Sequence, residues 1–210
     1  MHENITGIIL SGGKSSRMGE NKSLLKLGEI TVIEHIVKLM QSIFSEVILI
    51  TNSPSEYKFL EIPMYEDIYK NRGPIAGIHS GLINSKTDDN FIISCDIPLI
   101  TSEIINYLVN VKTNEPITVC KVDGFIQQLA AKYSKSVLPH VSSMLKFNDK
   151  EIENHGQNKK KLSVFSLINS VGAEIVETSK LDFYKDSAFL NMNRKKDYEN
   201  ILNIFNQEAK

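Results

Sequence analysis

Short apolar runs alternate with helical patterns along the first half of this 210-residue chain. Four apolar runs that stop at turn or polar residues predict strands at residues 5–10, 47–50, 62–65 and 91–95. Helix start signals predict helices at residues 31–44, from Ser53, at residues 74–84, and from Thr101 or Ser102 to residue 111. This alternation indicates parallel strands joined by right-handed crossovers, so we expect an α/β sandwich.

The second half of the chain is less regular. Residues 117–122 and 126–133 predict a strand pair with Asp123-Gly124 as its turn. Residues 137–147, 162–169 and 195–205 are typical of helices, and residues 174–176 of a last strand. The polar stretch 149–161 contains Lys159-Lys160-Lys161, which we interpret as a solvated loop in preference to a phosphate-binding patch. With no repeat and no linker, residues 1–210 are expected to form a single domain.

Composition and charge exclude several classes of protein. The chain is 41% hydrophobic and carries a formal net charge of −1, which argues against nucleic acid or an anionic membrane as its main partner. No apolar run could span a bilayer and the first residues do not resemble a secretion signal, so we expect a cytoplasmic protein. Cys95 and Cys120 have no metal or redox spacing and are expected to be buried thiols. His35 and His79 lie in helical patterns, where packing or surface positions are the expected roles.

The segment after the first predicted strand carries the strongest chemical signal. Gly12 and Gly13 end the apolar run, and Arg17 and Lys22 follow within a few residues. A bare backbone with free N–H groups and nearby cations suits a polyphosphate, although single cations are more often solvated surface charges. Ile8 stands where a Walker A loop needs its first glycine, and no G-x-G-x-x-G motif follows the strand. We therefore interpret the segment as a nucleoside triphosphate loop of another kind.

Polar residues follow each of the four predicted parallel strands. The glycine loop follows the first strand, Asn52 the second, Asp67 the third and Asp96 the fourth. Ligands in open parallel sheets bind beyond the carboxyl ends of the strands, so we expect these residues to converge on one rim. Asp96 could hold Mg²⁺ together with phosphate oxygens, or it could cap a turn. Asn52 is equally consistent with a ligand contact and with a turn that enters a helix.

These residues resemble a known family. Residues 10–22 resemble the L-x-G-G-x-S-x-R-M-G-x-x-K signature of molybdenum cofactor guanylyltransferases, a motif shared with sugar-phosphate and cytidylyl relatives. Residues 73–77 resemble the G-P-L-A-G segment of that family, and residues 95–98 its C-D-x-P strand end. Asn191 and Asn193, followed by Asp197, resemble its F-x-N-x-N-T-P-E-D segment and favour the guanylyl branch.

The resemblance implies a Rossmann-like three-layer α/β/α sandwich with a mostly parallel central sheet, similar to the nucleotide-diphospho-sugar transferases. It implies transfer of GMP from GTP to molybdopterin with release of pyrophosphate. By similarity, GTP would contact Leu10, Ser11, Gly12, Gly13, Lys22, Asn52, Asp67 and Asp96. Asp96 would hold Mg²⁺, while Asn191 and Asn193 would lie on the pterin side. Lys22 is expected at the α-phosphate and Arg17 beside the β- and γ-phosphates, so Lys22, Arg17 and Asp96 are the expected catalytic residues.

The chain departs from the family pattern at two places. Arg194-Lys195-Lys196 replaces Thr-Pro-Glu, so we expect the last helix to be capped differently, and Gln127-Gln128-Leu129 replaces Q-P-L. The alternatives are a molybdopterin cytidylyltransferase, a sugar- or alcohol-phosphate nucleotidyltransferase and a non-catalytic nucleotide-binding regulator. We expect a monomer whose further partners are other proteins of molybdenum cofactor biosynthesis and apo-molybdoenzymes.

Overall fold

The centre of the fold is a seven-stranded, mostly parallel sheet. The computed structural model describes residues 1–12, 21–155 and 162–208. Within the described residues, the strands lie side by side across the sheet in the order β5-β4-β1-β6-β8-β7-β9. Strands β1, β4, β5 and β6 run parallel, and β8 is antiparallel to both of its neighbours. The strands are β1 (His2–Leu10), β4 (Phe44–Ile50), β5 (Met64–Tyr65), β6 (Asp89–Ser94), β7 (Ile117–Val122), β8 (Phe125–Ser134) and β9 (Glu174–Glu177).

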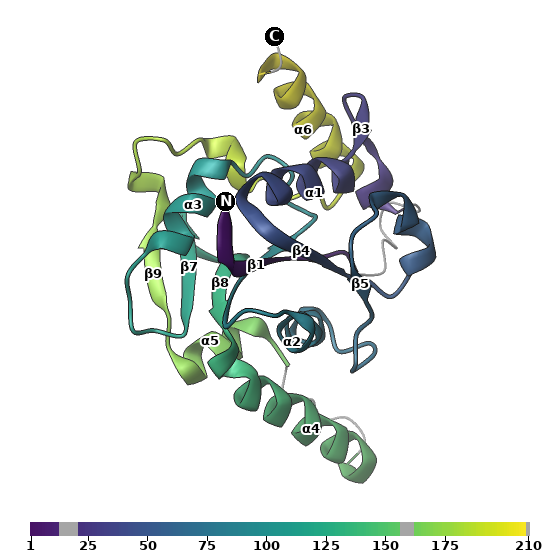
Figure 1. Ribbon diagram of the computed structural model, residues 1–210, viewed down its shortest axis with the longest axis vertical. Coiled ribbons are helices and arrows are strands. Elements are labelled where there is room, and N and C mark those ends of the chain that lie inside the picture. The colour runs from purple at the N-terminus through teal and green to yellow at the C-terminus, as the bar shows by residue number, and fades with distance from the viewer. Residues whose placement is uncertain (13–20, 156–161, 209–210) are drawn as a thin grey trace.

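Helices cover both faces of the sheet, which confirms the three-layer α/β/α sandwich (Figure 1). Helices α1 (Val32–Ile43) and α3 (Ser102–Asn110) pack on one face, and α2 (Pro74–Asn84), α4 (Leu138–His155) and α5 (Val164–Val171) on the other. Ile9 packs with the first group and Ile8 with the second, because successive side chains of a strand point to opposite faces. The continuous apolar runs in β1, β4 and β6 are therefore buried on both faces.

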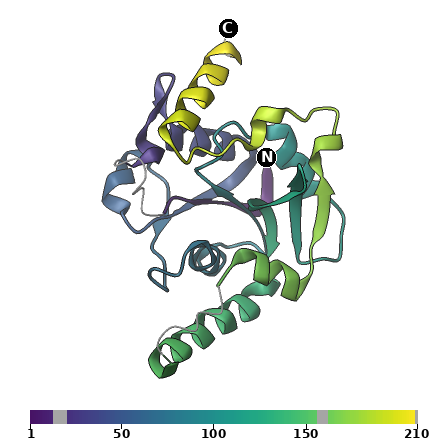
Figure 2. The ribbon, with the colours of Figure 1, turned by 180° about the vertical axis from the view of Figure 1, so that it is seen from behind.

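A smaller apolar cluster holds the C-terminal helix to the rest of the fold. Helix α6 (Lys195–Glu208) contributes Ile201 to this cluster, next to Met192 from the preceding segment. The cluster also contains Leu27, from the hairpin of β2 (Lys26–Leu27) and β3 (Ile30–Thr31), and Val32, the first residue of α1. Seen from behind, α6 lies beside this hairpin, at the end of the molecule away from α4 (Figure 2). The C-terminal segment is thus held against the β2–β3 hairpin and the start of α1.

Several local predictions are confirmed at the residue level. Thr31 caps α1 with the full capping box: its side chain accepts from the Glu34 N–H, and the Glu34 carboxylate accepts from the Thr31 N–H. Helix α2 has the expected bounds, and Gly73 precedes it with φ 68°, a conformation that favours glycine. The β7–β8 turn places Asp123 and Gly124 at positive φ, as a tight hairpin requires.

Other predictions need correction. The segment after Ser53 is a 3₁₀ helix, η2 (Pro54–Leu60), and Ser53 makes no side-chain cap bond. The expected strand at residues 62–65 shortens to β5, which pairs only at Leu49–Met64 and Ile50–Tyr65. Helix α4 continues to His155, so residues 149–155 are helical where a loop was expected. Lys159-Lys160-Lys161 lies outside the described residues.

Strand β1 begins at His2, three residues earlier than expected, and the β2–β3 hairpin was not expected at all. Both cysteines are buried free thiols, as expected. His79 is buried and His35 stacks edge-on against Phe205, so both histidines occupy packing positions. Among the helices of the described residues, none is long and apolar enough to cross a membrane.

Candidate active site

The carboxyl ends of the four parallel strands form the edge that carries the expected polar residues. Because their spatial order is β5-β4-β1-β6, residues that follow these strands lie in the order Asp67, Asn52, Ser11 and Asp96 along the edge. The Ser11 N–H donates to the Ile50 carbonyl at 3.0 Å, which ties the end of β1 to that of β4. The expected convergence of these strand ends on one edge is confirmed, and the fold supplies the order of the residues along it.

Lys22 and Asp96 meet at this edge. Lys22 Nζ lies 2.7 Å from Asp96 Oδ2, and the two side chains are 20% and 27% exposed. Lys22 begins the 3₁₀ helix η1 (Lys22–Leu24), which Asn21 caps through a bond from the Ser23 N–H to its side-chain oxygen. Asp96 follows β6 by two residues. The fold thus places a cation from the end of the glycine segment against a carboxylate from the neighbouring strand, and both remain accessible from solvent.

Gly12, two residues after the end of β1, exposes backbone that no side chain covers. It is exposed, it has no left-handed φ, and a Cβ built on it would meet nothing within 4 Å. Neither backbone conformation nor packing within the described residues therefore requires glycine at this position. A residue without a side chain next to Ser11 leaves the backbone open to a ligand. Gly13 and Arg17, which we expected beside it, lie outside the described residues.

Asn52 and Asp67 form a second group of contacts on the same edge. Asn52 Nδ2 donates to Asp67 Oδ2 at 2.6 Å, and Asn52 Oδ1 accepts from the Asp67 N–H and from Lys70 Nζ. Leu10 and Asp67 both lie close to Gly77 of α2, because a Cβ added to Gly77 would be 3.3 Å from Leu10 Cδ2 and 3.8 Å from Asp67 Oδ1. The hydrogen bonds fix the orientation of the Asn52 amide. Lys70, which also pairs with Glu66, was not among the expected site residues.

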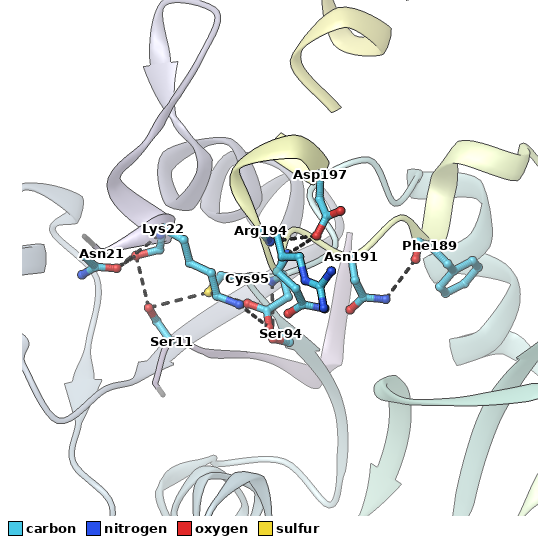
Figure 3. Close-up of polar contacts among 12 residues, drawn as sticks. Ser11, Asn21, Lys22, Ser94, Cys95, Phe189, Asn191, Arg194 and Asp197 are labelled. Atoms are coloured by element: carbon cyan, nitrogen blue, oxygen red, sulfur yellow. Dashed lines mark hydrogen bonds and ion pairs between the residues drawn. The ribbon is translucent and has the colours of Figure 1, made fainter. Parts of the chain in front are cut away.

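The C-terminal segment reaches the same place. The Met192 N–H donates to the Asp96 carbonyl at 2.8 Å, and Met192 is buried while Asn191 and Asn193 on either side are exposed. Figure 3 shows Lys22 and Asn191 on opposite sides of Ser94 and Cys95, with the Asn191 amide turned towards the Phe189 carbonyl, to which it donates at 3.2 Å. The chain therefore brings both asparagines beside Asp96, about a hundred residues away in sequence.

The Asp197 side chain caps the start of α6. One Asp197 carboxylate oxygen accepts from the N–H groups of Asn193 and Arg194, at 3.1 and 2.8 Å. An acidic side chain in the first turn also interacts favourably with the helix dipole. Asp197 thus holds the backbone of Asn193 and Arg194 in place, while the Asn193 side chain takes no part in these bonds.

Cys95, next to Asp96, is not a candidate nucleophile. Burial, followed by the Asp96 carboxylate, raises the pKa of its thiol to about 12. A thiol with so high a pKa stays protonated at neutral pH, and only the thiolate attacks. Cys95 Sγ lies 3.8 Å from Ser11 Oγ and 3.6 Å from Asp96 Oδ1, where the thiol acts as a small, weak donor.

The described residues contain no cluster of three or more histidine, cysteine, aspartate or glutamate side chains that could enclose a metal ion. A single accessible carboxylate, such as that of Asp96, instead suits an ion whose remaining ligands are water and phosphate oxygens. Mg²⁺ binds in this way, through one or two carboxylates and the substrate phosphates. The donor set at Asp96 therefore fits Mg²⁺ bound together with a nucleotide.

Sequence reasoning missed a buried polar group between Ser11 and Ser23. Tyr57 from η2 contacts Ser11, Asn21 and Ser23, and all of these except Asn21 are buried. Nothing in the sequence around Tyr57 distinguishes it from an ordinary aromatic residue on a helix face. Only the packing of η2 against the end of β1 reveals its position.

Comparison with known proteins agrees with this arrangement. The family described as the MobA-like NTP transferase domain matches residues 7–158, which include the end of β1, Lys22 and Asp96. The chain belongs to this family of nucleotidyltransferases. A protein of Carboxydothermus hydrogenoformans named "Probable molybdenum cofactor guanylyltransferase" is 36% identical over 204 residues, covering 97% of this chain and 98% of the relative. A protein of Clostridium perfringens with the same name is 35% identical over 195 residues, covering 92% and 94%.

Solved structures show the same fold. A crystal structure from Aquifex aeolicus superposes with a TM-score of 0.71 at 29% identity, covering 92% of this chain and 95% of that one. The molybdopterin-guanine dinucleotide biosynthesis protein A of Archaeoglobus fulgidus superposes with a TM-score of 0.79 over 96% of this chain and 99% of its own. At 18% identity, the second likeness concerns the fold alone.

Proposed function

We propose that residues 1–210 form a single-domain molybdenum cofactor guanylyltransferase, which transfers GMP from GTP to molybdenum-molybdopterin and releases pyrophosphate. The observation that carries the proposal is the Lys22–Asp96 pair at 2.7 Å, next to the bare backbone of Gly12. A cation, a carboxylate suited to a divalent ion, and an open glycine at one strand edge are the groups that nucleotidyl transfer needs.

In this proposal GTP lies along the edge of the sheet. Its β- and γ-phosphates meet the backbone N–H groups of Gly12 and Gly13 with Arg17 beside them, and Lys22 faces the α-phosphate. Leu10 and Ser11 contact the nucleotide at the end of β1, and Asn52 and Asp67 contact it further along the edge. The bonds within the Asn52–Asp67 pair support this assignment, because a preoriented amide and carboxylate can distinguish donors from acceptors on a ligand.

Asp96 holds Mg²⁺ in this proposal. Bound there, Mg²⁺ supplies a Lewis acid that neutralises charge on the α-phosphate. The fit rests on the accessible Asp96 carboxylate and on phosphate oxygens as the remaining ligands. Lys22 lies at hydrogen-bond distance from that carboxylate and provides a second positive charge at the same point.

The reaction is an in-line substitution at the α-phosphorus of GTP. An oxygen of the terminal phosphate of molybdopterin forms the new P–O bond, the bond to the bridging oxygen of the β-phosphate breaks, and pyrophosphate leaves with that electron pair. An ionised phosphate is already nucleophilic, so the protein needs no general base. Positioning and stabilisation of the developing charge are the contributions left to Lys22, Arg17 and the loop backbone.

The acceptor side is assigned to the C-terminal segment. Asn191 and Asn193 are exposed and flank Met192, whose N–H bonds to the Asp96 carbonyl. They therefore lie beside the proposed metal position without taking part in the nucleotide contacts, where an acceptor phosphate and its pterin would approach.

A pyrophosphate-release assay tests the proposal. Purified protein is incubated with Mg²⁺ and molybdenum-molybdopterin, with GTP in one arm and CTP in a second. Release that needs both the acceptor and GTP supports a guanylyltransferase, whereas release with CTP indicates the cytidylyl alternative. Calorimetric titration with GTP and Mg²⁺ accompanies the assay. GTP binding without release in the presence of the acceptor would instead indicate a nucleotide-binding regulator.

A further inference from the structure

The Tyr57 hydroxyl is the centre of a mostly buried hydrogen-bond network with Ser11, Asn21 and Ser23, called the hub below. The residue is 3% exposed, and its hydroxyl contacts three polar side chains. Tyr57 Oη lies 2.9 Å from Ser11 Oγ, 2.8 Å from Asn21 Nδ2 and 2.9 Å from Ser23 Oγ. Ser11 immediately precedes Gly12, while Asn21 immediately precedes Lys22. One phenol therefore contacts both ends of the segment that we assign to the triphosphate.

The bonds in this hub have one self-consistent direction. Ser11 Oγ–H and the Asn21 amide both donate to Tyr57 Oη. Ser23 Oγ–H donates to Asn21 Oδ1 at 2.8 Å, so the proton between Tyr57 and Ser23 comes from Tyr57. Tyr57 thus uses both acceptor positions and its one proton within the hub. A buried polar group with every bond satisfied is well ordered and is costly to disturb.

Asn21 connects the hub to the reacting groups through the backbone of η1. Asn21 caps the 3₁₀ helix that begins with Lys22, and Lys22 Nζ reaches Asp96 Oδ2. A shift of Asn21 therefore moves the backbone from which the Lys22 side chain extends. A displacement of about 1 Å at a positioned group is enough to lower turnover strongly.

We propose that Tyr57 is a positioning residue for nucleotidyl transfer: its hydroxyl joins Ser11 to Asn21 and thereby holds Lys22 in place over the α-phosphate. This inference rests on the proposed function. It assigns Tyr57 no contact with substrate, and it predicts a defect in turnover where a merely structural tyrosine would affect only stability.

The test is the variant Tyr57→Phe, which removes the hydroxyl and keeps the ring. Its matched control is Tyr133→Phe, because Tyr133 is fully buried and donates a bond of 2.7 Å to the Gln128 carbonyl in β8. Both variants remove one buried phenolic hydroxyl, which makes three hydrogen bonds at Tyr57 and one at Tyr133, so both should lower the melting temperature, Tyr57→Phe by more. We expect kcat of Tyr57→Phe to fall about ten-fold or more, with KM for GTP changed by less than about three-fold. Tyr133→Phe should keep its kcat.

Asn21→Ala provides a second variant and a coupling measurement. Asn21 is partly exposed, and its replacement breaks the same link at the Lys22 end together with the cap of η1 and the bond from Asn21 Nδ2 to Glu56 Oε2. We expect a similar loss of kcat in Asn21→Ala, and no further loss when it is combined with Tyr57→Phe, because residues acting through one contact are not additive. Independent, multiplying losses in the double variant would overturn the proposal.

The outcomes separate the inference from the proposed function. A kcat for Tyr57→Phe within about two-fold of the wild-type value, or a loss that Tyr133→Phe matches, overturns the inference and leaves the proposed function standing. A wild-type protein that releases no pyrophosphate from GTP in the presence of the acceptor overturns the proposed function, and the inference with it.

Discussion

Replacing Lys22 with alanine should affect catalysis far more than folding. The change removes the cation 2.7 Å from Asp96 Oδ2, at the position where we assign the α-phosphate. The Lys22 side chain is 20% exposed and its ammonium group pairs with Asp96, so the polar interaction that the fold loses is this ion pair.

The structure allows the two effects to be compared. A partly exposed ion pair contributes on the order of 0–1 kcal/mol to stability. A preorganised group that stabilises charge only in the transition state contributes more, and its removal costs about 10²–10³ in kcat, or roughly 2.7–4 kcal/mol. We therefore expect Lys22→Ala to lower kcat by about two orders of magnitude or more, while the free energy of unfolding changes by no more than about 1 kcal/mol.

The assay is steady-state pyrophosphate release with GTP, Mg²⁺ and the pterin acceptor, alongside chemical denaturation. Lys86→Ala is the matched control, because Lys86 Nζ lies 3.0 Å from Glu46 Oε1 near the start of β4, at the opposite edge of the sheet. Lys86 is 81% exposed against 20% for Lys22, so this control should lose no more stability than Lys22→Ala, and no activity. A kcat of Lys22→Ala close to that of Lys86→Ala would refute the assignment of Lys22 to the reacting phosphate.

Three further predictions concern the metal, the acceptor and pH. Asp96→Asn should raise the Mg²⁺ concentration needed for half-maximal activity, and an unchanged titration would exclude Asp96 as the metal ligand. Asn193→Ala should weaken use of the pterin acceptor while GTP affinity stays constant, and the substitution keeps the bond from the Asn193 N–H to Asp197. An equal loss of GTP binding in calorimetry would show that Asn193 belongs to the nucleotide side of the site. Burial lowers the pKa of His79 below its ordinary 6.5 in the folded protein. The unfolded chain therefore binds the additional proton first, so stability should fall as pH drops below about 6.5, and thermal melts should show a smaller fall for His79→Gln.

Local rules explain why much of the secondary structure could be predicted. The capping box at Thr31, proline at the first position of α2, and the Asp123-Gly124 turn each depend on neighbours within a few residues. The alternation of apolar runs and helices likewise specified parallel strands, whose carboxyl ends share an edge. The sequence alone was therefore sufficient to identify the fold class and the shared edge on which the strand ends followed by the glycine loop, Asn52, Asp67 and Asp96 lie.

Tertiary contacts decided the rest. Strand β5 has only two residues because pairing with the end of β4 determines its length, and η2 is a 3₁₀ helix in which Tyr57 packs towards β1. The 2.7 Å contact of Lys22 with Asp96, the approach of Met192 to the Asp96 carbonyl, and the hub at Tyr57 all join residues far apart in sequence. Hydrophobic periodicity and turn signals extend over a few residues only, so they determine elements and their faces. Which side chains then meet depends on how those elements pack, and packing is a property of the whole folded chain.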